Sequence, residues 1–344
     1  MSRREQPLRW GLIGGSTMAL KWVGPALVRA GHTLEAVASA TPARAEELAA
    51  AHQIPAVYTA WEDLLADPNV DAVYISSTNE HHAPQAIAAA QAGRHVLCEK
   101  PLALNAEEAL AMIAAAREAG VVLATNHHLR QLPAHRAVRK LIAEGTLGRT
   151  LAARVLHAGH LPPEWHGWRL EVPAAGAGVV YDLTVHDVDL LRFLLGQEVQ
   201  EVTALASPPL MASAGIEDAV MSVLRFADGA LAFCHDAFTT PNAENRVEIY
   251  GSDAAVQIAD GMFGHGGCEV WLVRDGEREL IVESEVPDLY LSVAQEFAAA
   301  VQGSGRPSSS GEDGLRAVEV VEAVRESLRS GRSVRVPAGL AEVA

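Results

Sequence analysis

Three side chains in this sequence have the types and spacing that acid–base chemistry on a carbonyl group requires. Lys100 follows the apolar run 95–98 and precedes a proline, while Asp182 and His186 stand four residues apart. In a helix this spacing places both side chains on one face. An ammonium or imidazolium group can stabilise and protonate an alkoxide, so the three could act where a carbonyl receives a hydride. A solvated lysine in a turn and an ordinary helix-surface pair are the alternatives.

A glycine-rich segment near the N-terminus is typical of a loop that binds a dinucleotide. Residues 11–19 follow an apolar run and open a helical pattern. The fingerprint G-x-G-x-x-G/A needs glycine at a tight turn and small residues beside the pyrophosphate and at the helix–strand contact. Gly14, Ser16 and Ala19 occupy these positions. Serine replaces the usual second glycine, and a turn without a ligand is the alternative, but the strand–turn–helix context favours cofactor binding.

The residues after the second predicted strand indicate which cofactor would bind. NAD-specific folds place Asp or Glu there, about 20 residues after the glycines, to bind the ribose 2′-hydroxyl. The corresponding segment here, Ala38–Arg44, contains no acid. Ser39 could donate a hydrogen bond to a 2′-phosphate, and Arg44 could reach it with a positive charge. We therefore predict NADP(H); the alternative is that Arg44 only opens a surface helix.

The first 125 residues alternate short apolar runs with Ala-rich helical patterns, which predicts a parallel sheet of βαβ units. Ligands bind such sheets at the carboxyl ends of the strands, where the glycine-rich loop and Lys100 both stand. Pro25 falls inside the first helix and predicts a kink or a helix that restarts there. The predicted strands are Arg9–Ile13, Leu34–Ala40, Ala72–Ser76, His95–Glu99 and Val121–Thr125, and the predicted helices include Ala43–His52, Pro84–Ala92 and Ala106–Ala119.

The pattern changes after about residue 150. Strand-length segments joined by short turns predict an antiparallel meander, followed by two helices. We predict an α/β Rossmann domain over residues 1–125 and, over 126–344, an α+β domain with a large open, mainly antiparallel sheet and C-terminal helices. The predicted strands are Leu151–His157, Glu201–Ser207, Ala219–Phe226, Ala230–Asp236, Arg246–Gly251, Glu269–Arg274 and Glu279–Glu283, and the helices are Tyr290–Val301 and Glu312–Ser330.

Composition excludes several classes of protein. Among 344 residues, 27 Lys and Arg against 43 Asp and Glu give a net charge of −16, so no basic face is expected to bind nucleic acid. No uncharged stretch approaches the roughly 18 residues that span a bilayer. No apolar segment follows Ser2-Arg3-Arg4, and the three cysteines are widely separated, so we expect a cytoplasmic protein without membrane partners. The 14 histidines lack tight spacing such as HExxH, so we expect no metal.

The sequence resembles the Gfo/Idh/MocA family of oxidoreductases over nearly its whole length. The resemblance implies a Rossmann domain followed by an open antiparallel sheet domain, and hydride transfer with a nicotinamide cofactor and no metal. It also implies a homo-oligomer, a dimer or a tetramer, because an open sheet face exposes apolar surface that association buries. The motifs that carry the resemblance are residues 14–19, 77–82, 99–101, 182–186 and 311–316.

The resemblance further implies roles for individual residues. Lys100 would hold and polarise the substrate carbonyl, His186 would donate the proton, and Asp182 would orient His186 and bind a sugar hydroxyl. The substrate residues would be Lys100, His157, Trp168, Arg169, Asp182 and His186, although Trp168 could equally be a core aromatic. The cofactor residues would be Gly14, Gly15, Ser16, Thr17, Met18, Ala19, Ser39, Ala40, Thr41, Arg44, Ser77, Thr78, Asn79, His82, Glu99 and Lys100, with Asn79 and Glu99 near the nicotinamide ribose.

Within the family, the sequence most resembles a bacterial subgroup that uses NADPH to reduce the cyclic keto-sugar 1,5-anhydro-D-fructose to 1,5-anhydro-D-mannitol. Ser16 is typical of that subgroup, whereas Gly176-Ala177-Gly178 departs from its three glycines. One alternative is another family dehydrogenase, for an inositol, an aldose or a diol. A second is a non-catalytic NADP-binding regulator, which Lys100 and His186 argue against. The segments closest to the subgroup are residues 11–17, 126–130, 167–171, 185–187 and 235–240.

Overall fold

The structure is a computed structural model that describes residues 7–262, 267–285 and 287–337. The Ser2-Arg3-Arg4 segment, which would begin a twin-arginine signal if an apolar segment followed it, lies outside the described residues. The chain divides into two compact units. The first comprises Met1–His128 with Asp288–Leu315, and the second comprises Leu129–Pro287 with Arg316–Ala344. The assignment of residues 1–125 to cofactor binding and of 126–344 to substrate binding stays a prediction.

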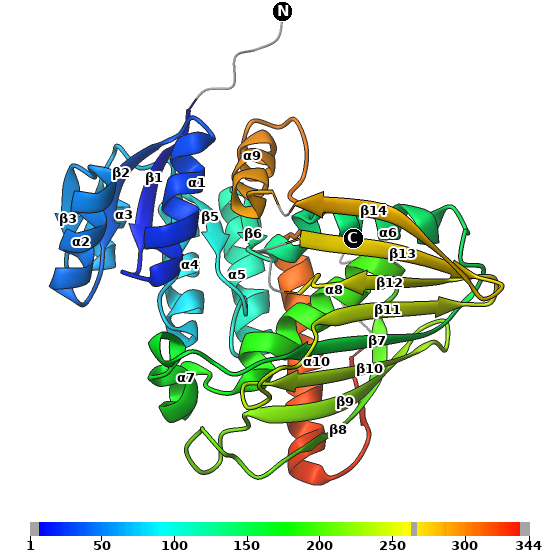
Figure 1. Cartoon of the computed structure of the whole chain (residues 1–344). Helices are drawn as coiled ribbons and strands as arrows, with labels where there is room; N and C mark the ends of the chain where they lie inside the picture. Colours follow the sequence, from blue (N-terminus) through cyan, green and yellow to red (C-terminus); the bar gives the residue numbers. More distant parts are fainter. Residues whose placement is uncertain (1–6, 263–266, 286, 338–344) are drawn as a thin grey trace, which may run out of the picture. The chain divides into compact units, whose positions relative to one another are not determined.

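A six-stranded parallel sheet forms the centre of the first unit (Figure 1). Its strand order is β3-β2-β1-β4-β5-β6. The chain adds strands on one side of β1 up to β3 and then continues on the other side from β4, although all the strands are parallel. In open α/β sheets this change of side opens a crevice at the carboxyl ends of the two central strands. The predicted parallel sheet is confirmed. Its strands are β1 (Arg9–Ile13), β2 (Thr33–Ala38), β3 (Ala56–Tyr58), β4 (Ala72–Ile75), β5 (His95–Cys98) and β6 (Leu123–Thr125).

Helices connect these strands, and the first of them is interrupted as Pro25 predicts. A π-helical turn over Ala19–Val23 gives way to α1 (Gly24–Arg29), in which Pro25 stands in the first turn. A proline there loses no helical hydrogen bond, because the first backbone N–H groups of a helix have no acceptor within it. The other helices of this unit are α2 (Pro42–His52), α3 (Trp61–Ala66), α4 (His82–Gln91), α5 (Ala106–Ala119) and α9 (Leu289–Val301), with a 3₁₀ turn at Asn79–His81.

The helix α9 joins the first unit although it comes late in the sequence. The Phe297 ring packs against the Trp10 ring of β1, with centroids 5.0 Å apart. Both side chains are fully buried, at 1% and 0% exposed. An aromatic pair of this kind adds about 0.5–1.5 kcal/mol beyond the apolar area that it buries. This contact ties a segment some 290 residues downstream to the first strand of the sheet.

A nine-stranded open sheet forms the second unit, as predicted (Figure 1). Its order is β14-β13-β12-β11-β7-β10-β9-β8-β15, and every neighbouring pair is antiparallel except β7 with β10, which is parallel. The short strands β12 and β15 were not predicted. The bounds are β7 (Thr150–Ala158), β8 (Val199–Ala206), β9 (Ala219–Phe226), β10 (Leu231–Ala237), β11 (Arg246–Gly251), β12 (Ala255–Ala259), β13 (Gly267–Arg274), β14 (Glu277–Glu285) and β15 (Val334–Arg335).

Helices cover one face of this sheet and leave the other open. In β9, the buried Val220 and Leu224 alternate with the exposed Met221 and Val223, which is the pattern of a strand covered on one side. The helices α6 and α8 pack together, and both contact the sheet. The remaining elements are α6 (Pro133–Ala143), α7 (Trp168–Glu171), α8 (Val185–Leu195), α10 (Gly311–Ser330), 3₁₀ turns at His128–Gln131, Pro163–Trp165 and Pro173–Ala175, and a π-helical turn at Val180–Thr184.

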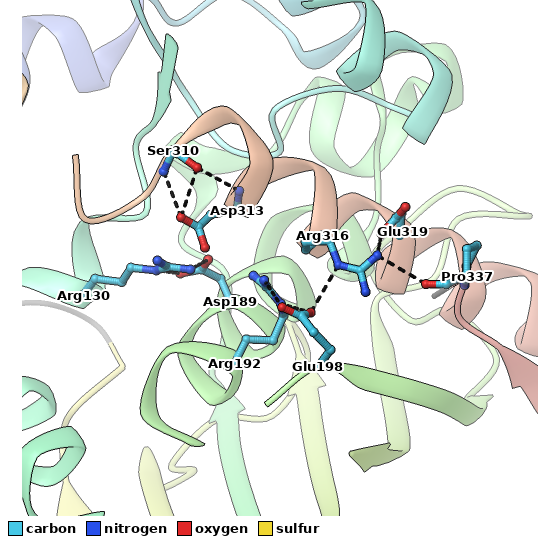
Figure 2. Close-up of polar contacts among 9 residues, drawn as sticks. All are labelled: Arg130, Asp189, Arg192, Glu198, Ser310, Asp313, Arg316, Glu319 and Pro337. Atoms are coloured by element: carbon cyan, nitrogen blue, oxygen red, sulfur yellow. Dashed lines mark hydrogen bonds and ion pairs between the residues drawn. The ribbon is translucent and has the colours of Figure 1, made fainter. Parts of the chain in front are cut away.

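All eleven residues of α8 are buried, although several of them are ionisable. Asp189 accepts two hydrogen bonds from the Arg130 guanidinium, at 2.8 and 2.6 Å, and the two side chains are 3% and 5% exposed. Arg192 donates two hydrogen bonds of 2.7 Å to Glu198, which also accepts one from Arg316 (Figure 2). Bidentate pairing of this kind compensates the cost of removing charged groups from water.

We predict that Asp189→Asn lowers the free energy of unfolding by about 3–5 kcal/mol, because it takes an ionised, bidentate carboxylate away from the buried Arg130 guanidinium. The matched control is Glu326→Gln, which breaks the Arg329–Glu326 pair on α10, where the two side chains are 76% and 42% exposed. The control should change stability by less than about 1 kcal/mol. Urea unfolding of both variants measures the difference. Equal transition midpoints would show that the buried pair does not stabilise the unit.

Candidate active site

The loop after β1 is shaped by a glycine that no other residue can replace without strain. Gly14 has a φ of +103°, and a Cβ added to it would lie 2.6 Å from the backbone nitrogen of Ser77. Ser16 occupies the second position of the fingerprint and begins the following helix. Its Oγ accepts a hydrogen bond from the Ala19 N–H at 3.0 Å and donates one to Ser76 Oγ at 2.7 Å. Serine therefore caps the helix and links the loops after β1 and β4.

Both residues predicted to select the cofactor lie beside this loop. A Cβ added to Gly15 would lie 2.6 Å from Arg44 Cβ and 3.0 Å from Ser39 Oγ. Arg44 donates a hydrogen bond to the Gly15 carbonyl at 3.3 Å, and Ser39 accepts one from the Thr41 N–H at 3.2 Å. A dinucleotide phosphate could bind here. The glycine backbone allows it to approach closely, the helix N-terminus offers N–H groups, and the exposed Arg44 guanidinium offers a positive charge.

The segment after β5 carries Lys100, and its carboxylate neighbour is firmly held. Glu99 Oε1 accepts hydrogen bonds from the Tyr74 hydroxyl at 2.5 Å and from the Asn126 amide at 2.6 Å, while Oε2 accepts one from the Lys100 N–H at 3.3 Å. Burial, with the nearby Glu99 charge, raises the pKa of Tyr74 well above its usual range. Sequence reasoning missed Tyr74 and Asn126, because each stands in or beside an apolar run and has no motif of its own.

His82 connects the segments that follow β4 and β5. Its Nδ1 lies 2.8 Å from the Pro101 carbonyl oxygen, and its Nε2 lies 3.2 Å from the Ser77 carbonyl oxygen. The side chain is fully buried, and burial lowers its pKa, which favours the neutral ring. Ser77 in turn donates a hydrogen bond to Gln85 at 2.6 Å. His82 thus joins Pro101, the residue after Lys100, to the segment that follows β4; its assignment to cofactor binding stays a prediction.

The helix predicted to carry Asp182 and His186 on one face is not regular. Residues Val180–Thr184 form a π-helical turn, and α8 begins only at Val185. The regular α-helix assumed for residues 182–186 is therefore not observed, and the shared face of Asp182 and His186 stays a prediction. The predicted orientation of His186 by Asp182 stays a prediction.

Arg169 brings three of the predicted substrate residues together in the second unit. Its Nε lies 3.3 Å from Asp182 Oδ2, and both side chains are partly buried, at 19% and 16% exposed. Its guanidinium lies over the Trp168 ring at 4.6 Å and over the Trp165 ring at 5.1 Å. Trp168 is half-buried, so it keeps an exposed edge. The arrangement supplies a carboxylate, a guanidinium and aromatic faces, which are the groups that bind sugars.

A buried cluster surrounds His157, which was predicted to line the sugar pocket. His157 on β7 stands opposite Asp236 on the parallel strand β10. Its Nδ1 lies 2.8 Å from Asp187 Oδ1, and its ring centroid lies 6.2 Å from that of His186. The Thr184 hydroxyl donates a hydrogen bond to Asp236. Sequence reasoning missed Asp187, Thr184 and Asp236; the signal for Asp236 was a carboxylate at a buried position of an alternating strand.

Burial dominates the electrostatics of this cluster. It raises the pKa of Asp187 to about 7. Burial and the neighbouring Asp187 together raise the pKa of Asp236 well above its usual range. Two carboxyl groups in contact and out of water cannot both ionise, so at least one holds a proton at neutral pH.

Among the described residues, one group of three could hold a metal ion: His157, Asp187 and Asp236. Their possible ligand atoms all lie within 4.8 Å of one another. The separation of 2.8 Å between His157 Nδ1 and Asp187 Oδ1 is that of a hydrogen bond. Ligand atoms around tetrahedral zinc lie about 3.3 Å apart, given bonds of about 2.0 Å. The geometry therefore favours a shared proton, and the expectation of no metal stays a prediction.

The predicted catalytic residues fall in different units: Lys100 belongs to the first, whereas Asp182 and His186 belong to the second. Their convergence on one substrate stays a prediction. The first unit holds the glycine-rich loop, the 2′-phosphate candidates and a lysine at the carboxyl edge of one sheet. The second unit supplies imidazole, carboxylate, guanidinium and indole groups. These are the components of a nicotinamide-dependent reaction on a polar carbonyl.

Comparison with known proteins supplies independent support. Residues 8–127 match the family model described as an oxidoreductase family with an NAD-binding Rossmann fold, and residues 135–257 match the GFO/IDH/MocA C-terminal domain. The chain is 44% identical to 1,5-anhydro-D-fructose reductase of Ensifer adhaerens, over 96% of this chain and 99% of that protein. It is 30% identical to myo-inositol 2-dehydrogenase of Thermotoga maritima, over 80% and 82% of the two chains.

Solved structures give the same result. An aldose-aldose oxidoreductase from Caulobacter crescentus, complexed with glycerol, superposes with a TM-score of 0.88 at 26% identity, over 96% of this chain and 100% of that chain. A levoglucosan dehydrogenase in complex with NADH superposes with a TM-score of 0.86 at 26% identity and the same coverage. Within the described residues, no helix is long and apolar enough to cross a bilayer. The chain belongs to the Gfo/Idh/MocA family of oxidoreductases.

Proposed function

We propose that this oxidoreductase reduces the keto group of 1,5-anhydro-D-fructose with NADPH and forms 1,5-anhydro-D-mannitol. The observation that carries the proposal is the 44% identity with a 1,5-anhydro-D-fructose reductase over 96% of the chain, a length that includes both units. The sugar-binding character of the Arg169, Trp168 and Asp182 group supports it from the second unit. Ser16, whose hydroxyl caps a helix in the first unit, supports the proposal because serine at this position is typical of the subgroup that reduces 1,5-anhydro-D-fructose.

The chemistry requires a hydride at carbon and a proton at oxygen, and NADPH supplies the hydride when bound. Lys100 is partly exposed and follows Glu99, the carboxylate that Tyr74 and Asn126 hold in place. We infer that its ammonium group stabilises the developing alkoxide. His186 supplies the proton to that oxygen. Asp182, joined to Arg169, binds a hydroxyl group of the sugar. The proposal requires Lys100 and His186 to meet at one carbonyl.

We assign NADPH rather than NADH from the end of β2. Ser39 and Arg44 both lie beside Gly15, and the segment 38–44 contains no carboxylate that would repel a 2′-phosphate. Arg44 is exposed and Ser39 half-buried, so both can reach a ligand at the loop. We also infer a cytoplasmic location, because all three cysteines are buried free thiols, as is usual in a reducing compartment.

We infer that a second copy of the chain covers the open face of the nine-stranded sheet. Large apolar side chains are exposed on this face, among them Leu205 at 74%, Met221 at 50% and Val223 at 43%. Leu205 and Met221 stand opposite each other on β8 and β9. Exposed apolar side chains that adjoin one another on a flat sheet are typical of a protein–protein interface. The homo-oligomer is a dimer or a tetramer.

The reaction is tested by steady-state rates of reduction of 1,5-anhydro-D-fructose with NADPH, compared with rates of oxidation of myo-inositol, aldoses and diols with NADP⁺. We predict that anhydrofructose gives the highest kcat/KM. His186→Ala should lower kcat by about 10²–10⁴-fold, because a placed acid contributes that factor, and should leave NADPH affinity unchanged. Lys100→Ala should lower kcat further, since it removes the charge on the alkoxide.

Each outcome has one meaning. A Lys100→Ala variant that keeps most of its turnover would refute the catalytic assignment. A preference for an inositol, an aldose or a diol would keep the family chemistry and overturn the substrate. NADPH binding without turnover of any carbonyl compound would favour the non-catalytic regulator.

Cofactor choice is tested at Ser39. We predict that Ser39→Asp lowers the ratio of kcat/KM for NADPH to that for NADH by about 10–100-fold, because a carboxylate repels the 2′-phosphate and accepts a hydrogen bond from the 2′-hydroxyl. Thr33→Asp, at the exposed opposite end of β2, adds the same charge far from the loop and should leave the ratio unchanged. An unchanged ratio in Ser39→Asp would remove the basis for NADPH.

Association is tested by light scattering coupled to gel filtration. We predict a mass of at least two chains for the natural protein, and a single-chain mass when Met221→Lys and Val223→Lys are combined, because two buried ammonium groups oppose packing of the sheet faces. Gln91→Lys, at an exposed position of α4, is the control and should keep the oligomer. A monomeric natural protein would contradict the inferred interface.

A further inference from the structure

A chain of buried polar side chains lies beside His186 and has no part in the reduction proposed above. It comprises His157, Asp187, Asp236 and Thr184, each at most 2% exposed. The parallel pairing of β7 with β10 sets Asp236 opposite His157. The helix α8 and the turn before it supply Asp187 and Thr184. Four elements, β7, β10, α8 and the π-helical turn before α8, therefore contribute to one cluster.

The hydrogen-bond partners of the four carboxyl oxygens indicate where the protons of this cluster lie. Asp187 Oδ1 lies 2.8 Å from His157 Nδ1, and Asp236 Oδ2 accepts a hydrogen bond from the Thr184 hydroxyl. Asp187 Oδ2 and Asp236 Oδ1 are buried and have no conventional hydrogen-bond donor among the described residues. Since buried oxygens need a partner, one proton held between Asp236 Oδ1 and Asp187 Oδ2 satisfies both atoms.

The pKa directions agree with this placement. Burial raises the pKa of both carboxyl groups, so the pair holds a proton at neutral pH. The His157 imidazole, 2.8 Å from Asp187 Oδ1, can donate to a carboxylate there, whereas Asp236 Oδ2 receives a hydroxyl, so the charge is assigned to Asp187. The Thr184 hydroxyl holds the second oxygen of Asp236, which leaves its protonated oxygen toward Asp187. The two carboxyl groups are therefore unequal: Asp236 acts as a neutral donor and Asp187 as the carboxylate.

The other titratable groups near Asp187 are neutral or paired. Burial and both carboxyl groups raise the pKa of the Cys234 thiol on β10, so it stays neutral. Asp189, two residues along α8, is paired with Arg130 at 2.6 Å. Asp182, on the preceding turn, is paired with Arg169. The charge of Asp187 thus acts on the two imidazoles, His157 and His186, whose ring centroids are 6.2 Å apart.

We propose that Asp187, held by Asp236 and Thr184, is a positioning residue that fixes the Nδ1–H tautomer of His157 and keeps the adjacent His186 protonated to higher pH. A buried carboxylate stabilises a nearby imidazolium, because Coulomb attraction is weakly screened away from water. His157 then presents Nε2 as an acceptor on the side of its ring away from Asp187. The inference rests on the proposed role of His186 as proton donor.

The first test is the pH dependence of kcat/KM with NADPH. Reduction needs protonated His186, so the rate falls as pH rises through its pKa. In Asp187→Asn the negative charge is lost, the pKa of His186 falls, and the basic limb should move to lower pH by about one unit. Lowering the pH should restore much of the lost rate, which a merely structural defect would not allow.

Asp236→Asn is the matched variant that distinguishes a charge effect from a packing effect. The asparagine amide replaces the carboxylic O–H as donor to Asp187, and its carbonyl still accepts from Thr184. The site loses neither a hydrogen bond nor the Asp187 charge. Its pH profile should therefore stay within a few tenths of a unit of the natural profile. Equal shifts in both asparagine variants would contradict the assigned proton positions.

A second measurement is independent of turnover. Long-range ¹⁵N–¹H spectra of the imidazoles report which ring nitrogen carries the proton and follow each titration. We expect the Nδ1–H tautomer for His157 in the natural protein. In Asp187→Asn, we expect His186 to titrate at lower pH than in the natural protein. Unchanged circular dichroism is the folding control. An Nε2–H tautomer of His157, or an unmoved His186 titration, would overturn the proposal. Absence of carbonyl reduction by the natural protein would instead overturn the proposed function.

Discussion

The burial of α8 on all sides is the constraint on which the second unit depends. An uncompensated charge inside a protein costs several kcal/mol, so an enclosed helix normally carries apolar side chains. This helix carries Asp187, Asp189 and Arg192, and each finds its partner on a different element, namely β7, the turn before α6 and the turn before β8. Three directional contacts fix both the rotation of α8 and its position along its axis. The pairing that makes burial tolerable therefore also fixes the backbone that presents His186.

A comparable constraint operates in the first unit, where the backbone does more than the side chains to set the positions of the loops. Parallel strands bring all their carboxyl ends to one edge, so the loops after β1, β2, β4 and β5 meet without any motif that links them. Hydrogen bonds between those loops then set their spacing: Ser16 bonds to Ser76, and His82 joins the Ser77 and Pro101 carbonyls. Replacing the second fingerprint glycine by serine fits this pattern, because the hydroxyl links two loops that glycine would leave unconnected.

Residues whose roles follow from local spacing could be predicted from the sequence, whereas those that depend on partners in distant segments could not. Gly15, Ser39 and Arg44 stand at set distances from the first two strands, and the structure places them together. Tyr74 and Asp236 are polar members of apolar strands, and only the sheet register shows what they face. Strands of two or three residues, such as β3 and β15, are too short to show periodicity. The π-helical turn before α8 escaped notice because i, i+4 spacing assumes a regular helix.

The distribution of burial separates the residues that can select a sugar from those that cannot. His157, Asp187 and Asp236 are at most 2% exposed, with hydrogen bonds between His157 and Asp187 and from Thr184 to Asp236, so changing the sugar would alter few of their contacts. Trp168, Arg169 and Asp182 are half-buried, and their exposed atoms can meet a ligand. Proteins named for reactions of myo-inositol and levoglucosan share this fold, so discrimination must come from side chains that vary without disturbing the core. The Arg169 group meets that condition, whereas the buried cluster, whose alteration would leave charges unpaired, is suited to control of protonation.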